Sequence, residues 1–527
     1  MVYRIGVDVG STHTDAVVIE PPAKLVHAVK TMTTPDVTTG IVRSLERVVK
    51  ESGVDPAEVD AVMFGTTHVI NAIVQRKGLA RVGVIRIGLP ATAAIEPMLD
   101  WPQDLREKVS AGTVLIRGGH EYTGEEIAPL DEDAAVKALK TFAGKKVDAI
   151  AVTSVFSIVN PEHELRVREL ASKYAPGIPV VLSHEIGSIG LLERENATIL
   201  NAATLPVMRR AIRALREALE RLGMPHAKMY FAQNDGTTAS EDYVAKYPVF
   251  TVIAPISNSI RGAYVLTGIP NAIVADTGGT TTNIGVLVNG YPREALEVDI
   301  AGVRTNIRAP DVLAIGLGGG SIIRWDEETR EVRIGPDSVG YRLVEEGIAW
   351  GGNTVTATDI ALAKGVMKID DPRCNPERAK KLIPAWLVEK AYAKMVQMLE
   401  DAIDRIKTRP EPEIVILVGG GSAMWPRRLR GAREVIRPEH AQSANAIGAA
   451  TALVGATIDK AYSYEQIPRE KALEDAKREA IRKAIEAGAD PSTVEIVEVE
   501  EIAMPYLPGN AVKVRVKAVG RLSPGRG

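Results

Sequence analysis

Two short segments with the same order of residue types suggest most of the chemistry of this chain. VDVGSTHTD begins at Val7 and ADTGGTTTN begins at Ala275, and both read Asp-x-Gly-[Ser/Gly]-Thr-x-Thr-[Asp/Asn]. In each, an apolar run leads into the aspartate and a second apolar run follows, as in a β-hairpin. Glycine lets backbone N–H groups approach an anion, and the hydroxyl groups add donors. Each segment is therefore expected to bind phosphate.

The two segments together predict one ATP site that is built from both halves of the chain. Mg²⁺ usually binds one or two carboxylates plus phosphate oxygens, so we expect Asp8 and Asp276 to hold Mg²⁺ (or Mn²⁺) and to be catalytic. Asp15 is a third catalytic candidate, which either positions the attacking group or only closes its hairpin. The alternative is two unrelated Gly-Thr hairpins, because short motifs recur by chance. The expected phosphate-binding residues are Gly10, Ser11, Thr12 and Thr14 in the first segment and Gly278, Gly279, Thr280 and Thr281 in the second.

Two glycine runs extend the predicted nucleotide site. In EIVILVGGGSAM a strand-like run leads into a glycine turn, and further on SANAIGAATAL opens a helix of small residues. A glycine run lets the backbone approach a planar base and ribose, although on its own it also fits a tight turn. We expect adenosine at Gly419, Gly420, Gly421, Ser422 and Asn445, and a third phosphate-adjacent loop near the hinge at Gly318, Gly319 and Gly320.

Composition excludes several other classes of function. Lysine plus arginine (64) nearly balances aspartate plus glutamate (67), and the net charge of -3 gives no reason to expect nucleic acid or an anionic membrane as partner. Cys374 is the single cysteine, so an internal disulfide or a thiolate metal cluster is excluded. No apolar run approaches the ~20 residues of a membrane span, and no secretory leader is evident. A cytoplasmic protein is expected.

The order of patterns along the chain predicts an α/β fold. Short apolar runs such as RVGVIRIG alternate with amphipathic stretches such as DAAVKALKTFAG, and TLPVMRRAIRALREALERLGM is typical of a long helix that ends at Gly223. After about residue 465 a charged helix precedes two alternating strands, STVEIVEVEEI and NAVKVRVKAV. We therefore predict an N-terminal lobe at residues 1–200, a second lobe at 201–465 and a small α+β appendage at 466–527.

Longer motifs resemble one family. They are GVDVGSTHTD (6–15), GTTHVINAIVQRKG (65–78), NPEHE (160–164), SHEIGSIGLLERENATILNA (183–202), DTGGTTTN (276–283) and AIGLGGGSI (314–322). In this order the chain resembles the hydantoinase A / 5-oxoprolinase family of the actin, Hsp70 and sugar-kinase superfamily. The resemblance implies a two-lobed α/β ATPase fold of duplicated ribonuclease-H-like type. It also implies ATP-dependent opening of a small cyclic amide (5-oxoproline, a hydantoin or a lactam) by phosphorylation of its carbonyl oxygen.

The resemblance also implies partners and a substrate face. Family members often work beside a B-type subunit, so an A-type subunit in a homo- or hetero-oligomer is expected. Thr66, Thr67 and Asn71 would line the substrate face, although GTT before an apolar-periodic run also fits a plain helix N-terminus with threonine caps. Arg117 either holds a substrate carboxylate or is an ordinary surface arginine.

Departures from the family pattern leave other functions open. The segment APISNSIRGA at 254–263 replaces the usual SGPAAG, and Asn283 stands where the second hairpin usually ends in aspartate. The alternatives are a subunit of an ATP-dependent ketone carboxylase, a small-molecule kinase and a non-catalytic partner protein that ATP switches. His120 and His184 are either general bases or loop histidines with local hydrogen bonds.

Overall fold

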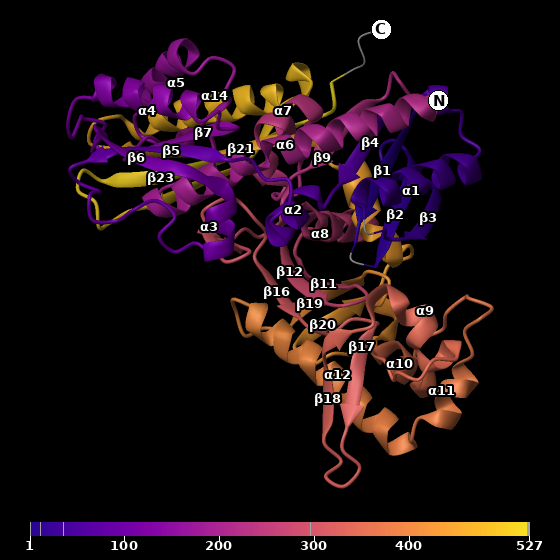
Figure 1. The fold of residues 1–527 in the computed structure, drawn as a ribbon. Helices are drawn as coiled ribbons and strands as arrows, with labels where there is room; N and C mark the ends of the chain where they lie inside the picture. The colour runs from indigo at the N-terminus through magenta and orange to yellow at the C-terminus, as the bar shows by residue number, and fades with distance from the viewer. Residues whose placement is uncertain (1, 11, 35, 296, 524–527) are drawn as a thin grey trace.

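The structure is a computed structural model that describes residues 2–10, 12–34, 36–295 and 297–523. Its largest sheet has nine strands and carries the first hairpin (Figure 1). Their order is β22 (Glu495–Ala503), β23 (Ala511–Gly520), β21 (Val454–Ser463), β10 (Thr238–Ser240), β9 (Lys228–Ala232), β4 (Val59–Gly65), β1 (Tyr3–Val9), β2 (His13–Glu20) and β3 (Lys24–Met32). We refer to this as the first sheet.

The second hairpin lies in a separate six-stranded sheet, the second sheet. Its order is β13 (Tyr291–Pro292), β12 (Thr282–Val288), β11 (Ala272–Thr277), β19 (Glu413–Val418) and β20 (Ala432–Ile436), with β16 (Val312–Ile315) also paired to β12. The four-stranded third sheet has the order β6 (Ser110–Arg117), β5 (Val82–Leu89), β7 (Ala149–Ser154) and β8 (Val180–Leu182). Two ribbons complete the strands: β14 (Val298–Ile300) with β15 (Val303–Thr305), and β17 (Ser321–Trp325) with β18 (Val332–Ser338).

Helices cover the sheets and connect them. They are α1 (Val37–Ser52), α2 (His68–Gln75), α3 (Gln103–Val109), α4 (Glu132–Gly144), α5 (Glu162–Tyr174), α6 (Leu191–Arg221), α7 (Glu241–Lys246), α8 (Ala254–Thr267), α9 (Leu343–Glu346), α10 (Ala357–Lys364), α11 (Pro376–Leu382), α12 (Ala385–Ile406), α13 (Ala444–Thr451) and α14 (Arg469–Glu486). The predicted long helix is α6, which begins earlier than its amphipathic pattern because its first half is buried on all sides. No helix among the described residues combines the length and apolar character that a bilayer span requires.

The two hairpins occupy equivalent places in two sheets, which is the predicted duplication. The strand β1 pairs antiparallel with β2 and parallel with β4, while β11 pairs antiparallel with β12 and parallel with β19. Figure 1 shows the second sheet and its helices α9–α12 as a lower lobe, set apart from the first and third sheets above. The predicted two-lobed α/β fold is confirmed.

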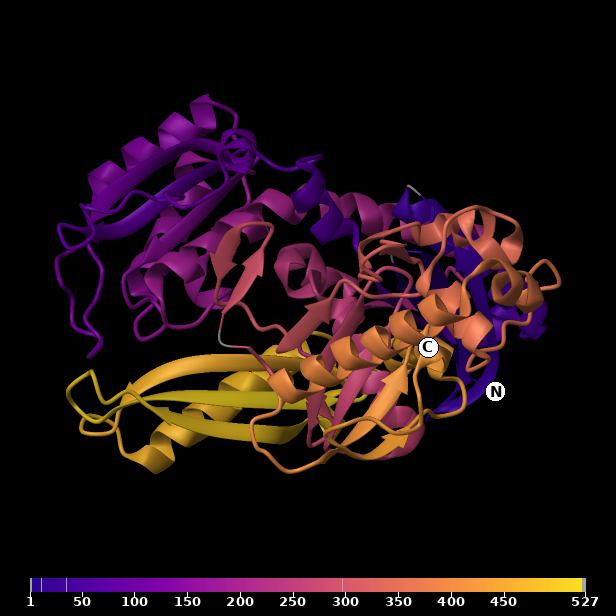
Figure 2. The ribbon, with the colours of Figure 1, turned by 90° about the horizontal axis from the view of Figure 1, so that it is seen from below.

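The sheets group the chain differently from the boundaries expected at 200 and 465. Strands β9, β10 and β21 fall in the range expected for the second lobe, yet they pair within the first sheet. The C-terminal strands β22 and β23 also extend that sheet, so they are not a separate appendage (Figure 2). A stripe of alanines four residues apart lets α14 pack closely on β21 and β23, and these buried residues are Ala472, Ala476, Ala480 and Ala484.

Candidate active site

Asp8 stands near the end of β1, and a glycine on the neighbouring strand makes room for it. Asp8 pairs in register with Gly65, the last residue of β4. A Cβ on Gly65 would lie 2.5 Å from Asn258 Nδ2 and closer still to Asp8 Oδ1, so only glycine leaves the carboxylate in place. Asp8 is 1% exposed, and its two oxygens accept hydrogen bonds from Asn258 Nδ2 (2.8 Å) and Asn445 Nδ2 (2.9 Å).

Asp276 occupies the equivalent position in the second sheet. It lies near the end of β11, and the glycine beside it is Gly419, which follows the parallel strand β19. A Cβ on Gly419 would meet Asp276 Oδ1 and would lie 2.5 Å from the carbonyl oxygen of Thr277. Gly419 also has φ of +88°, which L side chains rarely adopt. The two halves therefore present their strand-end carboxylates in the same way.

One helix joins the two carboxylates. Consecutive residues of α8 hold them: Asn258 donates to Asp8, and Ser259 Oγ donates to Asp276 Oδ2 over 2.6 Å. The negative charge of Asp276 also contributes to raising the pKa of Asp8, as expected for neighbouring carboxyls. Neither Asn258 nor Ser259 was predicted. They lie in the segment that departs from the family pattern, and only the tertiary structure shows which face of α8 turns to the carboxylates.

The tips of the two hairpins also meet. A Cβ on Gly279 would lie 2.8 Å from Thr12 Oγ1 and 3.1 Å from Thr12 Cβ, so the first hairpin contacts the second. Each tip is a tight turn closed by one backbone bond, Gly10 N–H to the His13 carbonyl and Gly278 N–H to the Thr281 carbonyl, both 2.9 Å. Ser11 lies outside the described residues, and Thr14 is buried behind the tip against Thr33 (Oγ1 to Oγ1, 3.3 Å).

Charge at this junction is concentrated in three carboxyls and one lysine. Asp15 pairs across the hairpin with Asp8, and its carboxylate lies 2.5 Å from Lys30 Nζ on the next strand. Burial, with added repulsion from Asp15 and Asp276, raises the pKa of Asp8 to about 8. Burial likewise raises the pKa of Asp276. Two acidic groups that resist ionisation lie at one junction, where a cation would favour their charged forms. Lys30 was not predicted, because its pairing depends on strand register.

The two glycine runs lie beside the second hairpin, and most of their backbone groups are bonded within the chain. Gly319 N–H and Gly320 N–H donate to the carbonyls of Gly278 (3.0 Å) and Gly279 (2.7 Å), so this loop supports the second hairpin. Gly421 N–H donates to the Thr277 carbonyl (2.8 Å), and Ser422 is buried. Gly318 packs against Thr280, and Gly420 faces open space. Asn445 Nδ2 donates to Asp8, and its contact with adenosine stays a prediction.

The predicted substrate face follows β4 directly. Thr66 is 1% exposed and hydrogen-bonds His68 Nδ1, while Asn71 Nδ2 donates to Thr67 Oγ1 over 3.2 Å. Thr67 precedes α2 and makes no side-chain cap bond, but Thr66 Oγ1 accepts a hydrogen bond from the His68 backbone N–H (3.2 Å), so the alternative of a helix N-terminus with a threonine cap stays open. Because Gly65 pairs with Asp8, these residues lie at the same edge of the first sheet as the carboxylate. Arg117 is instead exposed at the end of β6, in the third sheet.

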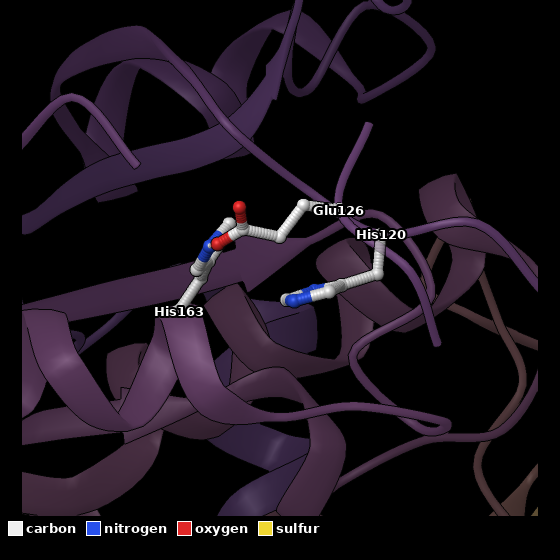
Figure 3. Close-up of side chains that lie close together, drawn as sticks. All are labelled: His120, Glu126 and His163. Atoms are coloured by element: carbon white, nitrogen blue, oxygen red, sulfur yellow. Dashed lines mark hydrogen bonds and ion pairs between the residues drawn. The ribbon is translucent and has the colours of Figure 1, made fainter. Parts of the chain in front are cut away.

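The two histidines left open by the sequence have different neighbours. His184 Nδ1 lies 2.6 Å from Glu164 Oε2, whereas His120 lies beside His163 and Glu126. Figure 3 shows His120 with His163 and Glu126, whose nearest ligand-type atoms lie within 4.8 Å of one another. His163 Nδ1 accepts a hydrogen bond from Gly119 N–H (3.0 Å), so its proton is on Nε2, which faces Glu126 Oε1 at 2.9 Å. A metal ion on Nε2 would have to displace that proton, and we assign no metal to this cluster.

This fold, with one strand-end aspartate in each of two matched sheets, defines a class of two-lobed α/β proteins. Residues 4–175 match the hydantoinase/oxoprolinase N-terminal region and residues 194–458 match hydantoinase/oxoprolinase. The chain belongs to the hydantoinase/oxoprolinase family, as predicted.

Relatives in this family carry different activities in their names. Caprolactamase subunit alpha of Pseudomonas jessenii is 30% identical over 69% of this chain and 55% of its own length. The acetone carboxylase beta subunit of Xanthobacter autotrophicus is 24% identical over 94% of this chain and 76% of its own length. The acetophenone carboxylase gamma subunit of Aromatoleum aromaticum is 27% identical, over 70% and 54%. The chain thus spans about half the length of two of these relatives.

Solved structures with the same fold include two of these enzymes. The ATP-dependent caprolactamase of Pseudomonas jessenii superposes with a TM-score of 0.78 at 21% identity, over 99% of this chain and 88% of that chain. Nucleotide-free acetone carboxylase has a TM-score of 0.64 at 20% identity, with the same coverage. At these identities the structures support the fold alone.

Proposed function

We propose that this protein is the A-type subunit of an ATP-dependent enzyme that opens a small cyclic amide. The observation that carries the proposal is the junction of Asp8 and Asp276, which brings one strand-end carboxylate and one phosphate-type hairpin from each sheet to the same helix. Relatives named caprolactamase and 5-oxoprolinase support a cyclic amide as the substrate class.

The residues at the junction fit a magnesium nucleotide. Carboxylate oxygens are the ligands Mg²⁺ prefers, and Asp8 and Asp276 would hold the ion. When bound, the ion would neutralise charge on the phosphate oxygens. The hairpin tips at Thr12 and Gly279 would hold the phosphates from two sides, with hydroxyl and backbone N–H donors. Lys30, paired with Asp15, balances part of the acidic charge.

Thr66, Thr67 and Asn71 would orient the amide at the same sheet edge. An amide carbonyl is a poor electrophile, and phosphorylation of its oxygen turns that oxygen into part of a leaving group. Water then adds at the activated carbon, and the C–N bond breaks as the nitrogen takes up a proton and leaves an acyl phosphate. A second water hydrolyses this acyl phosphate to a carboxylate and inorganic phosphate. The proposed role of the two hairpins is to hold the phosphate chain toward this carbonyl oxygen.

A ketone carboxylase subunit is the second candidate, and one observation favours it. Among the relatives described above, the acetone carboxylase beta subunit matches the largest share of this chain, 94%. A ketone carbonyl oxygen can be phosphorylated by the same arrangement, so the hairpins do not distinguish the two substrates.

Formation of ADP and product distinguishes these functions. The chain is assayed with Mg-ATP and 5-oxoproline, hydantoin, 2-pyrrolidinone or acetone, with and without a co-expressed B-type subunit and with and without bicarbonate. Amide-dependent ADP release with ring opening supports the proposal. Turnover of the ketone that requires bicarbonate supports the carboxylase, and a stable phosphorylated product supports a kinase. Lack of any Mg-ATP affinity refutes all three.

A further inference from the structure

A cavity of about 320 Å³ lies between elements of the first and third sheets. It is bounded by the loop after β7, the turn after β8, helices α7 and α14, strand β21 and the segment after β15. Among the residues that the structure describes, none of those predicted for the nucleotide or the substrate lines it. Its volume is near the lower end of ligand pockets, which span roughly 300–1,000 Å³, so it suits one small molecule.

Tyr243, on α7, brings a hydroxyl group to this cavity. The residue lines the cavity and is only 5% exposed, yet its hydroxyl has no hydrogen-bond partner within the described ranges. This oxygen is not among the fully enclosed polar atoms, so it keeps contact with the space that the side chain lines. Burial raises the pKa of Tyr243 well above its usual value, so the group stays a neutral O–H donor. A buried donor without an acceptor indicates that a ligand supplies one.

Lys483, on α14, carries the one charge of the lining that makes no ion pair within the part of the chain that the structure describes. The other charged residues of the lining are paired: Arg308 with Asp459 (3.0 Å), Lys460 with Asp475 (2.7 Å), Glu185 with Arg168 (3.0 Å) and Glu479 with Arg482 (2.6 Å). The pKa of Glu479 is lowered mainly by its bond from Arg482 and only secondarily by the charge of Lys483. Lys483 Nζ lies 5.3 Å from the centre of the Tyr247 ring, a contact that leaves the charge in place. A ligand with one negative charge would match it.

His184 adds an acceptor to the same cavity. Its Nδ1 lies 2.6 Å from Glu164 Oε2, which also accepts from the His184 backbone N–H over 3.1 Å. Burial favours the protonated form of Glu164, but bonds from His184 and Ser183 and the charge of Arg194 hold the pKa of this carboxyl below its usual range. The carboxylate fixes the proton of neutral His184 on Nδ1. Nε2 makes no hydrogen bond to any described residue and is not enclosed, so it is an acceptor open to the cavity.

We propose that this cavity binds a small hydroxycarboxylate. Its carboxylate would accept hydrogen bonds from the Lys483 ammonium and the Tyr243 hydroxyl, and its own hydroxyl would donate to His184 Nε2. The apolar side chains of Ile186 and Phe250 suit its carbon atoms. This binding site is separate from the proposed function, because it shares no residue with the junction of the two hairpins, and it requires no nucleotide.

The first test compares molecules of one size on the full chain without nucleotide. Ligand-observed NMR titrations use butyrate, butyramide and the 2-, 3- and 4-hydroxybutyrates. We expect butyrate to bind at least about tenfold more tightly than butyramide, because a charged acceptor bonds Lys483 and Tyr243 more strongly than a neutral one. At least one hydroxybutyrate should bind about fivefold more tightly than butyrate, because its O–H reaches His184.

Three results would overturn parts of this assignment or all of it. Equal binding of butyramide would overturn the carboxylate, and hydroxybutyrates no tighter than butyrate would overturn the role of His184. Failure of all five molecules to bind would overturn the site itself. Mg-ATP binding is measured in parallel: if it persists while no carboxylate binds, the cavity inference fails and the nucleotide site stands. If a carboxylate binds and Mg-ATP does not, the proposed function fails and the cavity site stands.

Two tyrosines one turn apart give a matched pair of variants. Tyr243→Phe removes only the hydroxyl at the cavity, so it should weaken butyrate about tenfold without lowering Tm. Tyr247 is similarly buried, at 6% exposed, but does not line the cavity, so Tyr247→Phe should leave the affinity unchanged. Equal affinities of the two variants would contradict the contact with Tyr243.

Two lysines on α14 test the charge. Lys483→Met keeps the length of the side chain and removes its charge, so butyrate should lose its advantage over butyramide. Lys477→Met is the control, because Lys477 is exposed on the same helix and lies outside the cavity. A preference for butyrate that survives Lys483→Met would overturn the assignment of this lysine as the carboxylate partner.

Discussion

Replacing Gly65 by alanine tests whether the Asp8 carboxylate holds the nucleotide. The new Cβ would lie 2.5 Å from Asn258 Nδ2 and closer to Asp8 Oδ1, whereas ordinary contacts begin near 3.4 Å. Asp8 or its partner must therefore move by about 1 Å. A displacement of that size in a positioned group can cost ~10²-fold in function, and overpacking also lowers stability by about 1–3 kcal/mol.

Thermal unfolding with and without a Mg-ATP analogue measures the effect. At a ligand concentration 100 times Kd, binding stabilises the wild type by about 2.7 kcal/mol, and after a ~10²-fold loss of affinity about 0.4 kcal/mol remains. Gly144→Ala is the control, because a Cβ there meets nothing within 4 Å and the residue ends α4. If Gly65→Ala kept the full nucleotide shift, Asp8 would not hold the nucleotide.

Four further outcomes follow from the same contacts. Asp276→Asn should remove most of the Mg-ATP-dependent Tm shift while the protein stays folded; an unchanged shift would show that the second carboxylate is not needed. Ser259→Ala removes a hydrogen bond to this carboxylate and should weaken Mg-ATP binding by about 1.5–3 kcal/mol, measured by calorimetry. Burial lowers the pKa of His68 to about 4, below an unfolded value near 6.5, so its contribution is complete above pH 6.5 and is lost as pH falls to 4. The free energy of unfolding of wild type minus that of His68→Gln should therefore fall by up to ~3 kcal/mol across that window, and a flat difference would contradict the burial of a neutral imidazole. Gly448→Ala places a Cβ against the Asn258 carbonyl and should destabilise the protein by about 1–3 kcal/mol in denaturant unfolding; unchanged stability would contradict the close packing of α8 on α13.

Local patterns were sufficient to predict the hairpins and the class of fold. The repeated Asp-x-Gly-x-Thr order marks a strand end, a tight turn and a return strand, all of which are set by residues within about ten positions. That is why the paired strands around Asp8 and Asp276 could be placed from sequence. The C-terminal strands β22 and β23 were predicted from residue types that alternate with a period of two, although in the fold β22 is mostly exposed and β23 mostly buried.

Contacts between distant segments could not be predicted in the same way. The pairing of β9 with β4, and of β10 with β9 and β21, adds residues from the expected second lobe to the first sheet, and no local pattern encodes that choice. Asn258 and Asn445 are 187 positions apart, yet both donate to one carboxylate, so their shared role emerges only in the folded chain. Asn445 was predicted to contact adenosine because its helix follows a glycine run. A sequence motif shows this order along the chain, but it does not show where a side chain points.

The placement of α8 has a mechanical consequence. Neighbouring residues on one turn of this helix are bonded to a carboxylate from each half of the molecule. Rotation of one half about an axis away from the helix must therefore stretch at least one of these bonds. An open and a closed state would differ in which aspartate keeps its hydrogen bond to α8. A ligand bound at the junction would therefore shift the position of the whole helix.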